Sequence, residues 1–110
     1  MIHLTDSALR EEILNAEREL DQVGVRERRM WDRVSVDPEK WVEGHYGNIG
    51  PVWVVAVMGR RCLYFNPVEG GWGWGTFDTW GVINGYHWQA DEIQHSIFQA
   101  LFAIDHGGAG

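Results

Sequence analysis

The first third of the chain repeats apolar and charged residues with helical spacing. Over residues 5–21, four apolar side chains fall on one side of a helix and charged residues cover the other. They are Leu9, Ile13, Ala16 and Leu20. A second helical run over residues 25–34, VRERRMWDRV, follows the helix-breaking Gly24. The pattern predicts a helical N-terminal segment over residues 5–34, formed by a helical hairpin or by one long helix kinked near Gly24.

The pattern becomes extended in the middle of the chain. Residues 52–59, VWVVAVMG, are apolar on both faces and rich in β-branched side chains, which is typical of a strand covered on both sides. GRR then predicts a tight turn, and residues 62–66, CLYFN, are expected to return as the second strand of a hairpin. WGWGTF and TWGVINGYHW predict two further strands with Asp78 and Thr79 near the turn between them, so strands extend over residues 52–88.

Three segments are predicted to lack long regular structure. In DPEKW, Asp37 can cap a short turn with Pro38 at its first position, where the missing N–H costs nothing. GHYGNIGP holds three glycines and a proline and is expected to be a loop. Residues 105–110, DHGGAG, are expected to fray.

The last predicted element is a helix over residues 91–104. Asp91 and Gln94 match an acidic variant of the capping box at its start. Five apolar residues form one stripe along it: Ile93, Ile97, Phe98, Leu101 and Phe102. The order of elements indicates an α+β fold in one domain, residues 1–110. We expect an antiparallel sheet of about four strands in meander order, with the N-terminal helices and the C-terminal helix packed on it.

Charge is divided unevenly along the chain and bears on the partner. The formal net charge is −7, and all nine Lys and Arg lie between Arg10 and Arg61. The acidic, aromatic second half argues against nucleic-acid binding, which needs cations to neutralise phosphates. It favours a basic protein partner, because complementary fields speed encounter.

Cysteine content and hydropathy bear on the compartment. The lone Cys62 excludes an internal disulfide and a cysteine-based zinc site, and its apolar surroundings predict a buried, inert thiol. No apolar run approaches the length needed to cross a bilayer, and the N-terminus is polar where a signal peptide is apolar. We therefore expect a cytoplasmic protein without membrane contact.

Tryptophan and glycine alternate in EGGWGWGTFDTWGVINGYHW, which holds four of the seven tryptophans. In an extended strand Trp72 and Trp74 share one face, and the intervening glycines leave the other face as bare backbone. Glycines weaken a strand, so a face made of glycines indicates either a neighbour packed closely against the backbone or a bend in the strand. Trp53, Trp80 and Trp88 are predicted to be core residues. For Trp72 and Trp74, burial and an exposed aromatic ledge both stay open.

No pattern for catalysis or metal binding is found in the chain. The histidines have no metal-ligand spacing, and neither a nucleotide fingerprint nor a nucleophile elbow is present. Glu69 and Asp78 flank the tryptophan segment, and two carboxylates beside aromatic rings are a pattern of sugar hydrolysis. A strand turn would bring them together by geometry alone, so we expect no enzyme, cofactor or metal.

The segment KWVEGHYGNIGPVWVVAVMGRRCLYFNPVEGGWGWGTFDTWGVI resembles small uncharacterised bacterial α+β proteins. The shared features are a tryptophan before a glycine-rich loop, a WVVAV strand, a YFN strand, EGG and a terminal helix. The likeness covers residues 31–102. The chain thus resembles a class of compact α+β proteins suspected of being toxin-neutralising immunity proteins. The resemblance implies no individual site residues.

These observations favour a non-enzymatic domain that binds another, basic protein, in the manner of an immunity-type inhibitor. Its predicted partner-binding residues are Glu69, Trp72, Trp74, Asp78 and Tyr86. Aromatic anchors supply most of the energy of an interface, and carboxylates steer a basic target. The alternatives are a small-ligand or carbohydrate-binding module that uses a Trp72/Trp74 ledge, and a homodimer paired through its aromatic face.

Overall fold

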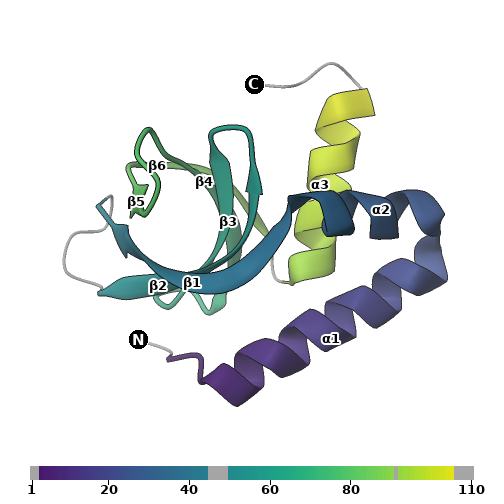
Figure 1. Ribbon diagram of the computed structural model, residues 1–110, viewed down its shortest axis with the longest axis horizontal. Coiled ribbons are helices and arrows are strands. Elements are labelled where there is room, and N and C mark those ends of the chain that lie inside the picture. Colours follow the sequence, from purple (N-terminus) through teal and green to yellow (C-terminus); the bar gives the residue numbers. More distant parts are fainter. Residues whose placement is uncertain (1–2, 45–49, 91, 106–110) are drawn as a thin grey trace.

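Helices cover one face of a strongly curved sheet (Figure 1). The computed structural model describes residues 3–44, 50–90 and 92–105. Its helices are α1 (Asp6–Val23), α2 (Val25–Val34) and α3 (Ile93–Asp105). Its strands are β1 (Ser35–Glu43), β2 (Pro51–Met58), β3 (Arg61–Asn66), β4 (Gly71–Thr76), β5 (Val82–Ile83) and β6 (Gly85–Ala90). The predicted α+β class is confirmed.

The N-terminal segment forms two separate helices, as one of the two predicted arrangements has it. α1 begins after Thr5, whose Oγ1 accepts a hydrogen bond from the backbone N–H of Ala8 at 3.2 Å. It ends at Gly24, whose backbone N–H donates to the Leu20 carbonyl at 3.1 Å. The backbone of Gly24 is extended, and α2 starts at the next residue in a new direction.

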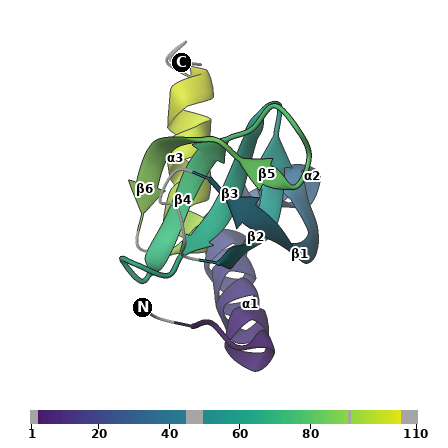
Figure 2. The same ribbon diagram turned by 90° about the vertical axis from the view of Figure 1, so that its left-hand side faces the viewer.

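The six strands lie in the order β5-β1-β2-β3-β4-β6. The four predicted strands are present as β2, β3, β4 and β6, and they are successive antiparallel neighbours. The prediction of about four strands is incomplete, because β1 and β5 extend the sheet and pair in parallel. A turn at Gly81, where φ is +96°, separates β5 from Trp80, and Asn84 then leads into β6 on the opposite edge. The sheet therefore curls until its two edges lie near each other (Figure 2).

The turn predicted around Asp37 and Pro38 is wrong, since both residues belong to β1. Lys40 pairs with Trp53 of β2, and Trp41 pairs with Val52. The register of β1 on β2 shifts between Ser35 and Glu39, so Pro38 lies in a bulge where its missing N–H breaks no regular ladder. Residues 45–49 of the GHYGNIGP loop, the Asp91 cap and most of the 105–110 tail lie outside the described residues, and Pro51 of the predicted loop begins β2.

The curved sheet separates two hydrophobic clusters, as expected for a strand that is apolar on both faces. The helix-side core lies between the outer face of the sheet and the helices. Its largest members include Leu20, Trp31, Leu63, Phe65, Trp72, Trp74, Ile93 and Ile97. The inner core fills the curl of the sheet with Trp41, Val52, Val54, Cys62, Tyr64, Phe77 and Ile83. β3 contributes to both clusters from alternate residues, and β2 does so except at the shift in register, where Val55 and Ala56 both face the helix-side core.

Trp72 and Trp74 lie in the helix-side core and are 0% exposed, so burial holds of the two arrangements that the sequence left open. The Trp74 indole N–H donates to the carbonyl of Ser96 in α3 at 3.0 Å. The ring of Trp72 meets Phe65 edge-on, with 5.4 Å between centroids. Helix α3 covers this face, so the alternation of glycine and tryptophan places both indoles inward.

The glycine face of β4 points into the inner core, where a neighbour is packed against it, as one of the two alternatives from the sequence has it. A Cβ added to Gly75 would lie 2.9 Å from Ile83 Cγ2 and 3.0 Å from both Tyr64 Cε1 and the Gly85 carbonyl oxygen. In the ladder, Tyr64 lies directly opposite Gly73. The glycines therefore provide the space that the Tyr64 ring and β6 occupy.

The other tryptophans divide differently from the prediction. Trp53 is half-buried beside the helix-side core and donates to the Leu4 carbonyl at 3.1 Å. Trp80 is 54% exposed, so its predicted core position is wrong. It covers the end of the inner core, because its ring contacts Trp41 and its indole N–H donates to Glu39 at 2.6 Å. The side chain of Trp88 lies outside what the structure describes.

The partly buried carboxylate of Glu12 in α1 destabilises the folded protein when it is charged. Burial raises the pKa of its carboxyl, the Trp72 indole N–H lowers that pKa in part, and the charge of Glu92 raises it. Among the described residues, neither the buried Glu12 Oε2 nor Trp72 Nε1 completes a hydrogen bond of ordinary geometry. Since folding raises this pKa, stability falls as the pH rises from the unfolded value of 4.5 through the folded one.

Replacing Glu12 with glutamine is therefore expected to raise the free energy of unfolding at neutral pH. The gain should disappear well below the unfolded pKa of 4.5, where the native carboxyl is neutral in both states. Urea unfolding at the two pH values measures it, with the exposed neighbour Glu11→Gln as control. An equal gain at acidic pH would show that the charge of Glu12 is not the cause.

Candidate functional site

The five residues predicted to bind a partner do not form one surface. Glu69 precedes β4 and Asp78 follows it, so the strand separates them by about 20 Å at 3.3 Å per residue. Trp72 and Trp74 point into the helix-side core from the strand between them. Only Tyr86, on β6, is an exposed aromatic of this set. The structure therefore does not join these residues into one exposed acidic, aromatic surface.

Both predicted carboxylates already have partners within the chain. The Gln89 side-chain amide donates to Glu69, and the Tyr86 hydroxyl hydrogen-bonds to the Gln89 amide oxygen. Asp78 accepts a hydrogen bond from the Asn84 amide at 2.8 Å and lies 3.4 Å from an Arg60 nitrogen. Arg60 compensates part of the charge of Asp78, and Glu69 accepts a hydrogen bond from a neutral amide, so both carboxylates are already engaged within the chain.

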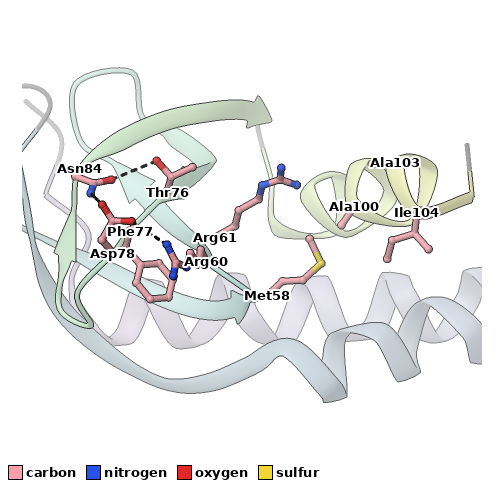
Figure 3. Close-up of a pocket in the computed structure, with 11 residues that line it drawn as sticks. Met58, Arg60, Arg61, Thr76, Phe77, Asp78, Asn84, Ala100, Ala103 and Ile104 are labelled. Atoms are coloured by element: carbon pink, nitrogen blue, oxygen red, sulfur yellow. Dashed lines mark hydrogen bonds and ion pairs between the residues drawn. The ribbon is translucent and has the colours of Figure 1, made fainter. Parts of the chain in front are cut away.

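The structure places a groove of about 690 Å³ between the β2–β3 turn and α3, which we call the turn groove (Figure 3). Its polar side holds Arg60, Asp78 and Asn84, and Thr76 donates to the Asn84 amide oxygen at 3.4 Å. Arg61 extends from β3 toward α3. The apolar lining comes from Met58 and Phe77 of the sheet side and from Ala100, Ala103 and Ile104 of α3.

A second groove of about 510 Å³ lies between α2 and α3, and we call it the helix groove. Its lining residues are Val25, Arg26, Arg29, Met30, Arg33, Leu101 and Ile104. Ile104 therefore borders both grooves at the end of α3. Val25 and Ile104 are 67% and 54% exposed, so two aliphatic side chains of the same groove are open to solvent.

The two grooves together form the α3-end surface, and positive charge is concentrated on it. Five of the nine Lys and Arg of the chain line the grooves: Arg26, Arg29, Arg33, Arg60 and Arg61. This concentration stands out in a protein whose net charge is −7. An apolar centre rimmed by arginine is a common composition of protein interfaces.

Arg28 of α2 differs from the groove arginines Arg29 and Arg33, because it is held by several ion pairs within the chain. Its guanidinium lies 3.0 Å from Asp21, 3.0 Å from Asp32 and 3.8 Å from Glu17. Within the described parts of the chain, neither Arg29 nor Arg33 makes an ion pair. Carboxylates of α1 and α2 therefore neutralise Arg28, whereas Arg29 and Arg33 are exposed cations on the helix groove.

Comparisons with family models, with curated proteins and with solved structures find no match to this chain. A function for this chain must therefore be inferred from its own surface residues and grooves. For the part of the chain that the structure describes, no helix has both the length and the apolar character to cross a membrane.

The Cys62 thiol and the potential metal ligands are the reactive groups to consider among the described residues. Burial raises the pKa of the Cys62 thiol to about 12, against a smaller opposing effect of a hydrogen bond with the Gly75 backbone. Cys62 is fully buried in the inner core, which confirms the predicted burial of this thiol. Among the described residues, His, Cys, Asp and Glu form no group of three that could hold a metal ion.

The spacing of the arginines in α2 is a sequence signal for the α3-end surface that the search for partner-binding residues missed. Arg26, Arg29 and Arg33 recur at spacings of three and four residues and so share a helix face. The helical pattern explains them only as the polar side of an amphipathic helix. Phe102 belongs to the predicted apolar stripe of α3 but is exposed, because Ala100 and Ala103 face the core at that end of the helix.

Proposed function

We propose that this chain is a non-enzymatic protein-binding domain whose contact surface is the α3-end surface. The observation that carries the proposal is the pair of grooves on either side of the exposed Ile104, lined by five arginines. Exposed aliphatic groups that adjoin charged rims favour association with another macromolecule. An immunity-type role as an inhibitor, in the cytoplasm, is the form of binding that the sequence resemblance suggests.

Two alternatives have less support. A carbohydrate-binding module would use Trp72 and Trp74 as its ledge, and both are buried. A small ligand in the turn groove would meet Asp78 and Asn84, which already bond to each other and to neighbouring side chains. Binding sites for small molecules usually present polar groups that are free to orient the ligand. Protein binding therefore remains the better supported function.

The function is tested by comparing three tagged forms of the full chain as bait in cells of the source organism. The forms are the wild type, Val25→Ser/Ile104→Ser, and the control Leu14→Ser/Val68→Ser. All four positions are exposed aliphatic residues, but only the first pair lines the helix groove. We expect quantitative mass spectrometry to find proteins that the wild type and the control enrich and the groove variant loses, because an interface core depends on its apolar contacts.

Other outcomes would redirect or overturn the proposal. Equal recovery by all three baits would remove the α3-end surface from the interaction, and specific recovery by none would contradict protein binding. A wild type that elutes near twice 12.6 kDa in size exclusion, with a monomeric groove variant, would assign the surface to a homodimer instead. Inhibition itself would be tested by co-expression with a toxin-like product of a neighbouring gene.

A further inference from the structure

We infer that the occupant of the helix groove is an amphipathic helix of the partner that carries carboxylates one and two turns apart. This inference rests on the proposed function and names the chemistry of its partner. It reverses the charge expected from composition, because the total charge of −7 describes the whole chain and not this groove. Three features of the groove support it: the spacing of its arginines, its apolar floor and the ion pairs beside it.

The spacing of the arginines defines a line of positive charge. Arg26, Arg29 and Arg33 stand three and four residues apart on α2, so their side chains lie on one face of the helix. At 1.5 Å per residue they extend over about 10 Å along its axis. A partner helix that lies along the groove repeats its own residues with the same rise, so acidic residues at matching positions can meet successive arginines.

The apolar lining suits a helix better than an extended peptide. Val25 and Met30 of α2 face Leu101 and Ile104 of α3 across a groove of about 510 Å³. Helices that bind in grooves insert apolar anchors at intervals of three and four residues, while an extended segment needs a free sheet edge for its backbone bonds. The residues that line the groove all belong to two helices, so it offers side-chain contacts rather than a strand edge.

The ion pairs on α2 determine which cations are open to a partner. Arg26 pairs with Asp105 at the end of α3, and both side chains remain about half-exposed. Arg29 and Arg33 are exposed and, among the described residues, have no such pair. An incoming carboxylate can bind these two without breaking an existing bond, whereas at Arg26 it must compete with Asp105.

The remaining acidic surface would help to orient such a partner. Carboxylates elsewhere on the chain repel an acidic helix, so the favourable field is confined to the arginine-lined side. This arrangement gives specificity through unfavourable contacts at other positions as well as through attraction at the groove. A basic partner would experience the opposite field and avoid the helix groove.

The test is a selection of displayed peptides on the immobilised full chain. The library holds designed helices of about five turns whose surface positions vary among Glu, Lys, Gln and Leu. We expect the recovered peptides to carry Glu at positions three, four or seven residues apart beside a stripe of Leu. The most frequent peptide is then synthesised with a fluorophore, and its affinity is measured by fluorescence anisotropy.

Charge-reversal variants locate the binding of that peptide. Arg29→Glu/Arg33→Glu is expected to weaken it by roughly tenfold or more, because two charge pairs become repulsive. The matched control Arg10→Glu/Arg18→Glu makes the same change of net charge on exposed residues of α1 and should leave the affinity within about twofold. Asp105→Asn, which frees Arg26, is expected to strengthen binding. Circular dichroism verifies that each variant is folded.

Any other result overturns the inference about the acidic helix. The results also show separately whether the proposed protein-binding function fails with it. Selection of Lys-rich peptides, or equal loss in the two double variants, would contradict an acidic partner at this groove. Sedimentation of the chain with anionic vesicles, lost in Arg29→Glu/Arg33→Glu and accompanied by no peptide binding, would assign the arginines to a lipid surface. If no peptide is selected but cellular partners still depend on Val25 and Ile104, the inference fails and protein binding stands.

Discussion

Replacing Trp74 with alanine is expected to lower the free energy of unfolding by about 3–5 kcal/mol. The indole is fully buried between β4 and α3, and its N–H bond to Ser96 joins the sheet to the last helix. The substitution opens a cavity in the helix-side core and leaves the Ser96 carbonyl without this donor. Small domains unfold with roughly 5–15 kcal/mol in total, so the loss would be severe. Equilibrium denaturation in urea measures it.

The same truncation at Trp80 provides the control. Trp80 is 54% exposed and covers the end of the inner core, so its removal deletes an equal volume with less lost burial. We expect it to cost less than half as much as Trp74→Ala. Similar losses at the two positions would mean that α3 does not seal Trp74 against the sheet as described.

Replacing Gly75 with alanine should destabilise the protein by about 1–3 kcal/mol although it adds only one methyl group. That methyl would stand 3.0 Å or less from atoms of Tyr64, Ile83 and Gly85, and the Gly85 atom belongs to the backbone. The Gly85 oxygen cannot retreat without moving β6, and the Tyr64 ring and Ile83 side chain have little room to shift because both are buried in the inner core. Thermal and urea unfolding of the variant measure the cost.

Gly24→Ala is the matched control for this added methyl. The atom nearest to the new methyl carbon would be a carboxylate oxygen of Glu27, at 2.9 Å, which is the mobile end of a long side chain. The backbone there is extended, so alanine adopts it without strain and restricts the unfolded chain. We expect unchanged or slightly higher stability. A loss equal to that of Gly75→Ala would indicate that steric crowding is not the cause.

The elements with a clear period were predictable from the sequence, and those set by distant pairing were not. The apolar stripe with Leu9 and Leu20 and the β-branched run before Gly59 identified α1 and β2, since local pattern and burial agree there. Strand β1 was missed because Asp37 and Pro38 favour a turn locally, whereas pairing with β2 determines the structure. The two-residue β5 has no period that a sequence could reveal.

The candidate site was less predictable than the fold. Alternation showed that Trp72 and Trp74 share a face, but a period of two cannot say which face a helix will cover. The packing of α3 on that face decided the matter. The five groove arginines come from α2, from the β2–β3 turn and from the first residue of β3, and only folding brings these segments to the same end of α3.

The helix-side core joins the beginning of the chain to its end, because α1 and α2 share it with Ile93 and Ile97 of α3. During synthesis on the ribosome, the apolar stripe of α1 and the indoles of β4 emerge well before α3 can cover them. Domains finish folding only when their last contributing segment is available, and uncovered apolar surface is prone to aggregation. In a nascent chain stalled before residue 93, the helix-side face of the sheet would therefore lack its cover. Trp72 and Trp74 would be exposed there and available for chaperone binding.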